Sequence, residues 1–175
     1  MSIKFTVFGH VTNFKLLGIN FQPDFNFSEY VSTLITVCNQ RLYLLTQLKK
    51  QGLGLAETDI VFNAIILSKI IYAIPALAGY FTESQIKQIS AIFNKAKRWQ
   101  LITDNYDFNV IVDNLQSSLF QQSKSTQHCL NHLYEPTHNT SSISLRARGH
   151  NFYVPFIKYD HNNKHFLHRC LVHYQ

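Results

Sequence analysis

Histidines and cysteines are the residues of this sequence whose types could hold a metal or form a nucleophile–base pair. Eight of the nine histidines follow residue 127, and His128 and His132 are four residues apart, a spacing at which one helix face can ligate a metal. Cys129 adjoins His128, but neighbouring side chains on a helix diverge by about 100° and do not face each other. The remaining candidate ligands lie in the C-terminal tail: His161, His165, His168, Cys170 and His173. Structural zinc commonly uses paired cysteines. The sequence has no Cys-x-x-Cys, so we expect solvated histidines without a bound metal or cofactor.

Carboxylates are scarce and scattered. The six aspartates and four glutamates include no adjacent pair, whereas two-metal chemistry needs carboxylates held close together. Neither a Gly-x-Ser-x-Gly elbow nor a glycine-rich phosphate loop is present. The sequence therefore predicts no catalytic residue, and a chain that is not an enzyme by itself.

Basic residues indicate the kind of partner. Sixteen lysines and arginines against ten acidic residues give a formal charge of +6, which favours a polyanion. Over residues 82–99 a helical wheel separates cations from apolar residues into two halves. The cationic half holds Lys87, Lys95, Lys97 and Arg98, and the apolar half holds Ile86, Ile89, Ile92, Phe93, Ala96 and Trp99. The basic face either contacts phosphates or is simply solvated, and the sequence leaves both interpretations open.

A second basic segment lies in the tail. In a strand, Arg146, Arg148 and His150 would share one face, and with the nearby Lys158 and Lys164 they could contact phosphates. Aromatic residues are interleaved with these cations: Phe152, Tyr153, Phe156 and Tyr159. Such rings stack on bases in sites for single-stranded nucleic acid. The alternative is that they anchor the tail as core residues, which we favour for Phe152 and Tyr153.

Helical periodicity predicts the elements that position these residues. Apolar residues recur at helical spacing over 27–51. Asn26 is the predicted N-cap of this helix, Glu29 completes a capping box, and Gly52 is a C-terminal signal. A second helix over 56–72 is apolar nearly all round, which predicts central burial.

The remaining elements are shorter. Pro75 is expected to stop the second helix, and the pair Thr82 and Gln85 forms the capping box of a third helix over 82–99. Further along we expect a helix capped by Asp107 and ending at Leu115, a helix over 117–133, a linker over 137–144, a strand over 152–154 and a short helix near Phe166.

The predicted fold is therefore mainly α: a thumb-like helical bundle with a small N-terminal β-hairpin and an irregular C-terminal tail. Strands over 3–8 and 14–21 would form the hairpin within residues 1–26. The bundle covers 27–135, and a basic tail rich in histidine and aromatic residues covers 136–175.

Three segments carry a resemblance to a known family: KLLGINFQPDFNFSEYVSTLITVCNQRLYLLTQLKKQGL, VFNAIILSKIIYAIPALAGYFTESQIKQISAIFNKAKRW and SLRARGHNFYVP. Together they resemble the region of jockey-like non-LTR retrotransposon reverse transcriptases that follows the catalytic palm. The resemblance covers roughly residues 14–173. Ala147 stands where the family pattern would place a proline between two arginines, a departure typical of a decayed or divergent copy.

The resemblance implies a binding function without catalysis. In the family, the hairpin that leads into the thumb grips the primer, so Leu17, Gly18 and Ile19 would lie near a primer terminus, with Gly18 allowing close backbone approach. The alternative is a glycine at a hairpin bulge without a ligand. The catalytic residues of the family lie upstream and are absent. The chain would then retain sequence-tolerant binding of RNA or an RNA–DNA hybrid. The other possibility is a remnant that binds no nucleic acid and oligomerises through surface that the missing palm once covered, which exposed apolar area would favour.

Location is only loosely indicated. Three scattered cysteines do not form a disulfide framework and suggest a reducing compartment. The apolar stretch over 60–81 contains Lys69 near its middle, and a lysine at mid-bilayer costs about 3 kcal/mol. We therefore expect a core helix rather than a membrane span, and an intracellular protein, nuclear or cytoplasmic.

Overall fold

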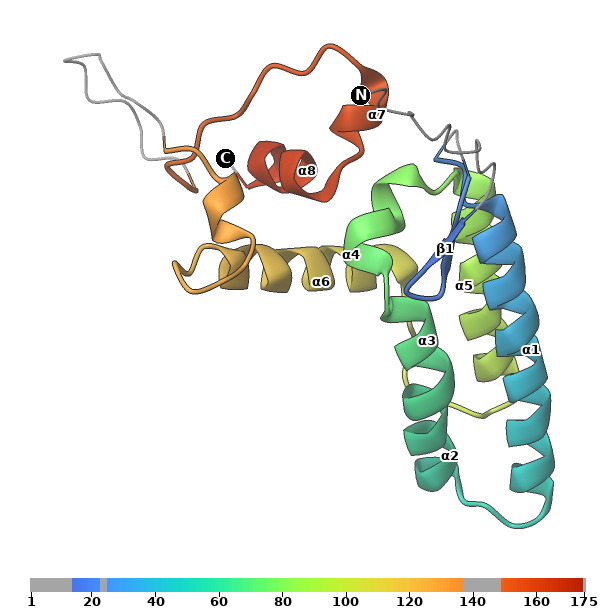
Figure 1. Ribbon diagram of the computed structural model, residues 1–175. Helices are drawn as coiled ribbons and strands as arrows, with labels where there is room; N and C mark the ends of the chain where they lie inside the picture. Colours follow the sequence, from blue (N-terminus) through green and yellow to red (C-terminus); the bar gives the residue numbers. More distant parts are fainter. Residues whose placement is uncertain (1–13, 23–24, 137–148, 175) are drawn as a thin grey trace, which may run out of the picture.

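The computed structural model describes residues 14–22, 25–136 and 149–174. Its fold is mainly α-helical with a small antiparallel sheet at the N-terminal end, as the sequence predicted (Figure 1). The strand predicted over 3–8 and the linker predicted over 137–144 lie outside the described residues.

The hairpin pairs β1 (Phe14–Leu16) with β2 (Ile19–Phe21). Leu17 and Gly18 form its turn with φ angles of 50° and 82°, the pattern of a type I′ turn. The expectation of one strand over 14–21 was therefore wrong, because that stretch is the whole hairpin. Leucine rarely adopts positive φ, so this turn lacks the Asn-Gly signal from which such hairpins are predicted.

The long helix α1 (Ser28–Lys50) is confirmed. Gly52 follows its end with φ 105°, and Leu53 N–H donates to Leu48 O at 3.2 Å. This bond belongs to a Schellman motif, which needs a residue that tolerates positive φ at the position of Gly52.

The start of α1 differs from the predicted capping box. Asn26 Oδ1 accepts a hydrogen bond from Ser28 N–H at 2.9 Å, but the N-cap position is Phe27. Glu29 does not reach back to the cap; its Oε1 accepts a hydrogen bond from Asn20 Nδ2 at 3.2 Å. A contact between β2 and the helix has thus replaced the local cap.

The second helix is a rod of three segments: α2 (Leu55–Phe62), the π-turn η1 (Asn63–Leu67) and α3 (Ser68–Ile71). Its fully buried residues are spaced four apart: Thr58, Phe62, Ile66 and Ile70. In an uninterrupted α-helix, residues four apart drift around the axis by about 40° per step. The i→i+5 bonding of η1 offsets that drift, so the four residues stay on one line.

Only one side of the rod is buried, so the predicted central burial was wrong. Ile60 is 68% exposed and Tyr72 is 57% exposed. Within the described part of the chain, the run Leu55–Tyr80 is long and apolar enough to span a membrane by length and composition, and 33% of its most apolar stretch is buried. Core helices can have the same length and composition, and the chain turns at Ala73 within this run, which is compatible with a protein that stays outside the membrane.

Pro75 acts differently from the expectation. The helix ends before it, at Ile71, and Pro75 lies in the first turn of α4 (Ile74–Leu77). A missing N–H is harmless at that position. The short η2 (Ala78–Tyr80) then leads into the next helix.

The capping box of α5 (Glu83–Arg98) is confirmed. Gln85 N–H donates to Thr82 Oγ1 at 3.3 Å, and Thr82 N–H donates to Gln85 Oε1 at 2.9 Å. Two orphan backbone donors are thereby satisfied.

The helices α1 and α5 run parallel, with the α2–η1–α3 rod antiparallel beside them (Figure 1). At one end Gln85 Nε2 donates to Ser28 Oγ at 3.2 Å, and at the other Lys49 Nζ donates to Gln100 O at 2.9 Å. We call α1, the rod and α5 the three-helix unit. Its buried core includes Phe27, Val31, Leu34, Leu42, Phe62, Ile66, Ile70, Ile89, Ile92 and Phe93.

One helix replaces the two predicted after residue 107. α6 (Phe108–Ser123) has Asp107 as its N-cap, with Oδ1 accepting from Asn109 N–H at 2.8 Å. The helix predicted over 117–133 was wrong in extent, because residues beyond Ser123 form turns and the short η3 (Asn131–Leu133). Ser123 Oγ is buried and lies 2.6 Å from Tyr134 Oη, so the chain folds back on itself here.

The tail packs on α6 through α8 (Phe166–His173), α7 (Asp160–Asn163) contacts α8, and the predicted helix near Phe166 is confirmed. The strand predicted over 152–154 was wrong, since an isolated bridge joins Phe152 to Pro136. We call the second half of α6 together with the packed tail the C-terminal assembly. Its core consists of Phe120, Tyr134, Phe166, Cys170 and Leu171.

Candidate nucleic-acid interface

The basic face of α5 keeps two freely exposed cations. Lys87 Nζ lies 4.0 Å from Glu83 Oε2, and both side chains are largely exposed. Arg98 is exposed and has no partner among the described residues. The prediction that Lys87 and Arg98 lie off the apolar face is confirmed, because Ile89, Ile92 and Phe93 are the buried ones.

The other two cations of α5 donate hydrogen bonds to neighbouring groups, Lys95 from a half-buried position and Lys97 from an exposed one. Lys95 Nζ donates to Asn39 Oδ1 at 2.8 Å and lies 4.6 Å from the centroid of the Trp99 ring. Lys97 Nζ donates to Thr103 O. These acceptors are neutral, so the contacts position the two ammonium groups without cancelling their charge.

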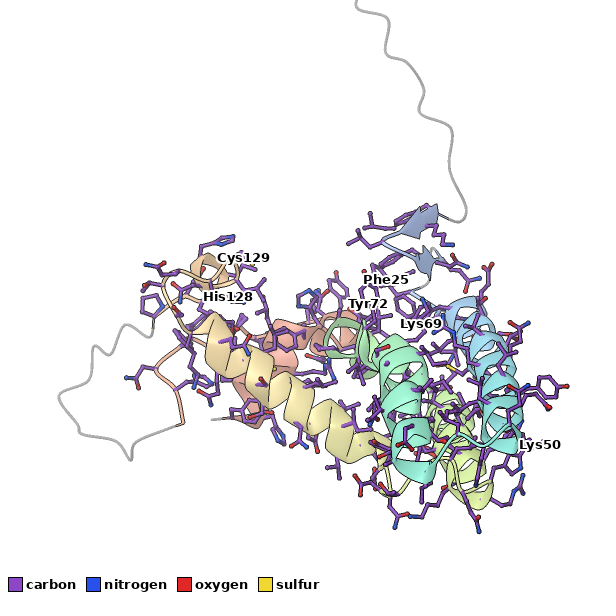
Figure 2. All side chains as sticks on the ribbon, turned by 90° about the horizontal axis from the view of Figure 1, so that it is seen from below. Phe25, Lys50, Lys69, Tyr72, His128 and Cys129 are labelled. Atoms are coloured by element: carbon purple, nitrogen blue, oxygen red, sulfur yellow. The ribbon has the colours of Figure 1, made fainter. Side chains whose placement is uncertain are left out.

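Two cations of the last turn of α1 lie at the same end of the unit as the end of α5. Lys49 Nζ donates to Trp99 O at 3.3 Å and Gln100 O at 2.9 Å, and so caps the neighbouring helix. Lys50 is exposed at the same end of the unit (Figure 2). The parallel packing of α1 and α5 brings these cations near Lys95 and Arg98, and nothing in the local sequence indicates that packing.

A groove with both polar and apolar walls runs between α1 and α5. Both walls carry residues at positions i, i+4, i+7 and i+11: Ser28, Ser32, Ile35 and Asn39 on α1, and Ser84, Gln88, Ala91 and Lys95 on α5. Two hollows lie along it, one of 590 Å³ near the helix N-termini and one of 270 Å³ beside Lys95, and Gln88 lines both. We call this feature the α1–α5 groove. Sequence reasoning missed it, although the repeated polar stripe was its signal.

The hairpin residues predicted to approach a primer are at a turn. Gly18 is exposed and takes φ 82°, and a Cβ added to it would meet nothing within 4 Å. The glycine is therefore required by the turn and not by a close approach within the chain. Leu17 beside it is 76% exposed. No described contact joins Gly18 to the cations of α5.

Of the tail residues predicted to contact phosphates, the structure describes His150, Lys158 and Lys164. Arg146 and Arg148 lie outside the described residues. His150, predicted to face phosphates with them, is a core residue: its Nδ1 accepts from Phe152 N–H at 3.1 Å, and its Nε2 lies 2.8 Å from Leu171 O. Phe152 is half-buried and stacks on Tyr134 with ring centroids 4.7 Å apart.

The other tail aromatics are exposed. Tyr153, predicted to be a core residue, is 49% exposed, Phe156 is 93% exposed and Tyr159 is 58% exposed. Lys158 Nζ lies 5.9 Å from the Tyr159 ring centroid. These side chains remain accessible, and the structure does not join them to the basic face of α5.

Metal-ligating geometry is not present in the described part of the chain: no group of three or more His, Cys, Asp or Glu side chains is placed to hold an ion. His128 and His132 follow the end of α6 and do not share a helix face, contrary to the i, i+4 expectation. His128 Nδ1 accepts from Leu130 N–H at 3.1 Å. Figure 2 shows His128 and Cys129 in the turn beyond α6, away from the three-helix unit.

The cysteines differ in reactivity. Cys129 is exposed, whereas Cys38 and Cys170 are buried. Burial raises the pKa of both buried thiols to about 11, so they stay protonated at neutral pH and are poor nucleophiles.

Comparison of the chain with known protein families, curated proteins and solved structures gives no match. The resemblance to reverse transcriptases therefore stays a prediction, and the site is argued from its geometry.

Proposed function

We propose that the chain binds RNA or an RNA–DNA hybrid in a sequence-tolerant manner along the outer face of α5, without polymerase chemistry of its own. In this proposal it derives from the thumb and downstream region of a non-LTR retrotransposon reverse transcriptase. Lys95 and Arg98 are the principal phosphate contacts, and Lys87 lies further along the same helix.

One observation carries the proposal: the cations of this surface are held by neutral groups. Lys95 and Lys97 donate to an amide oxygen and a carbonyl oxygen. Within the described residues, the ion pair between Lys87 and Glu83 is the one salt bridge, and it is solvent-exposed. Exposed pairs of this kind contribute little. The positive charge therefore remains available to phosphates, whose contacts are largely independent of base sequence.

Binding is tested by fluorescence anisotropy of a labelled RNA–DNA hybrid over a range of salt concentrations. Lys95→Gln combined with Arg98→Gln removes two charges, while glutamine can still bond Asn39. We expect weaker binding on every sequence, with the slope of log affinity against log salt flattened by about 1 to 2. Lys69→Gln with Lys124→Gln removes the same charge at positions that have no assigned nucleic-acid contact, and is the matched control. Equal effects of the two double variants would show non-specific attraction and contradict this site.

A second candidate function has an observation in its favour. The hairpin exposes Phe14 at 54%, Leu16 at 53% and Leu17 at 76%, and the rod exposes Ile60 at 68%. Exposed apolar groups of this kind mark protein contacts, so the chain would oligomerise and bind no nucleic acid. Sedimentation of the wild type and of Leu16→Ser with Leu17→Ser separates the two functions. A higher oligomer that the double variant dissolves, with no hybrid binding, supports the second function.

A further inference from the structure

We infer that the α1–α5 groove holds a single-stranded stretch of the nucleic acid, with one base stacked on the outer face of Phe25. The inference rests on the proposed function and adds where the strand lies and what holds it. Phe25 lies between the hairpin and the first turn of α1 (Figure 2).

Phe25 is the outermost ring of a cluster of packed aromatic side chains. Phe27, only 1% exposed, contacts Tyr80 edge-on with centroids 5.7 Å apart. Tyr80 in turn stacks on Phe25 at 5.7 Å with an interplanar angle of 20°. Phe25 remains 49% exposed and lines the 590 Å³ hollow. A ring supported from the core on one face and open on the other is a platform for a base, because every base has a stacking face.

The groove walls match the rest of a nucleotide. Near Phe25 they are hydroxyls and amides, including Ser32, Gln85 and Gln88, which are neutral partners for base edges and ribose hydroxyls. Further along α5 come Lys95 and Arg98. At about 1.5 Å per residue, Gln88 and Arg98 are roughly 15 Å apart along the axis, a distance that a few nucleotides span.

The two ends of the groove therefore act through different forces. The helix N-terminal donors near Phe25 are already used: Ser28 N–H bonds Asn26 Oδ1, and Gln85 N–H bonds Thr82 Oγ1. The helix N-termini therefore hold no phosphate, Lys164 is the cation that lines this hollow, and Phe25 itself contributes stacking. Bases inside a duplex are stacked on each other, so the free face that Phe25 needs is found on an unpaired strand. Stacking releases no counterions, whereas phosphate contacts do.

The experiment compares a blunt RNA–DNA hybrid with the same hybrid carrying a single-stranded RNA extension, measured by anisotropy over a salt range. For the wild type we expect the extension to tighten binding. Phe25→Ala should weaken binding of the extended hybrid about ten-fold, leave the blunt hybrid unchanged and keep the salt slope. Phe25→Trp retains the ring and should restore the affinity. Tyr72→Ala removes another exposed aromatic ring, outside the groove, and should change nothing.

The outcomes separate this inference from the proposed function. If the wild type binds neither probe, the proposed function fails and the groove inference fails with it. If both probes bind but Phe25→Ala has no effect, or Tyr72→Ala has the larger one, the groove inference is overturned and hybrid binding stands. A fall in salt slope for Phe25→Ala would also overturn stacking. Circular dichroism confirms that each variant is folded as the wild type.

Discussion

In the three-helix unit the buried residues come from stripes along helices, whereas in the C-terminal assembly they come from separate segments. Phe62, Ile66 and Ile70 follow one another on a single rod. Phe120, Tyr134 and Phe166 instead belong to α6, a turn and α8. The first core is specified by local periodicity, and the second exists only once the tail has folded back.

The side-chain hydrogen bonds of the three-helix unit and of the C-terminal assembly also differ. Side-chain bonds inside the three-helix unit either stay within one helix, as Thr36 bonds Ser32 O, or join packed helices, as Lys95 joins Asn39. In the C-terminal assembly, irregular backbone depends on buried polar groups: Ser123 Oγ lies 2.6 Å from Tyr134 Oη, and His150 Nε2 lies 2.8 Å from Leu171 O. Loss of one such partner leaves an unsatisfied buried group, so the assembly should open more readily than the unit.

The largest expected effect tests whether the two regions unfold as one. Phe93→Ala in the unit and Phe120→Ala in the assembly remove equal rings from sites that are 2% and 0% exposed. Each should lower the free energy of unfolding of its own region by about 3 to 5 kcal/mol. In hydrogen exchange by mass spectrometry, Phe93→Ala should lower protection in α1 and α5, whereas Phe120→Ala should lower it in α8 alone. Equal loss in α1 for both variants would indicate a single cooperative unit.

Alkaline pH should lower the stability of both regions by a smaller amount, because each region contains one buried thiol. Burial raises the pKa of Cys38 and of Cys170 from 9.0 to about 11, so the folded state holds the protonated form. The resulting stability is present in full below pH 9 and is lost as pH rises towards 11, by about 2 kcal/mol per thiol. Urea unfolding at increasing pH measures it.

The cysteine variants assign that loss to a region. Cys38→Ala should reduce the alkaline loss within the three-helix unit, and Cys170→Ala within the C-terminal assembly. Burial also raises the pKa of Tyr30 and Tyr134 above 10.0, so part of the loss at higher pH remains in either variant. An unchanged pH dependence in both would contradict the thiol assignment.

The smallest effect concerns a cap within the unit. Thr82→Ala removes the acceptor for Gln85 N–H and should destabilise α5 by about 1 kcal/mol. Ser84→Ala, an exposed neighbour, should change stability by less than about 0.5 kcal/mol. Thermal unfolding of the two variants measures the difference. A similar midpoint for both would mean that α5 is held by packing and not by its cap.

The sequence was sufficient to predict features that depend only on residues within one helix. The extents of α1 and α5, the cap at Thr82 and the cap at Asp107 follow from local spacing and capping chemistry. The sequence was insufficient where a residue or helix far along the chain determines the local structure. Glu29 bonds Asn20 instead of its own cap, and the rod is buried on one side only.

Part of the candidate site could likewise be predicted from the sequence, and part could not. Arg98 could be placed on the exposed face from a helical wheel, whereas the bond between Lys95 and Asn39 and the groove beside it require the parallel packing of α1 and α5. His150 was assigned to a basic surface because it would share one face of a strand with Arg146 and Arg148, and only the folded tail gives its two ring nitrogens their partners.

Trp99, the single tryptophan of the chain, makes the end of α5 optically distinct. Its half-buried indole lies under the ammonium of Lys95 at 4.6 Å. A ligand that draws this ammonium away changes the electric field across the indole. The wavelength of the Trp99 fluorescence emission therefore shifts. The protein thus carries its own label at the end of α5, and no dye has to be attached to follow an event there.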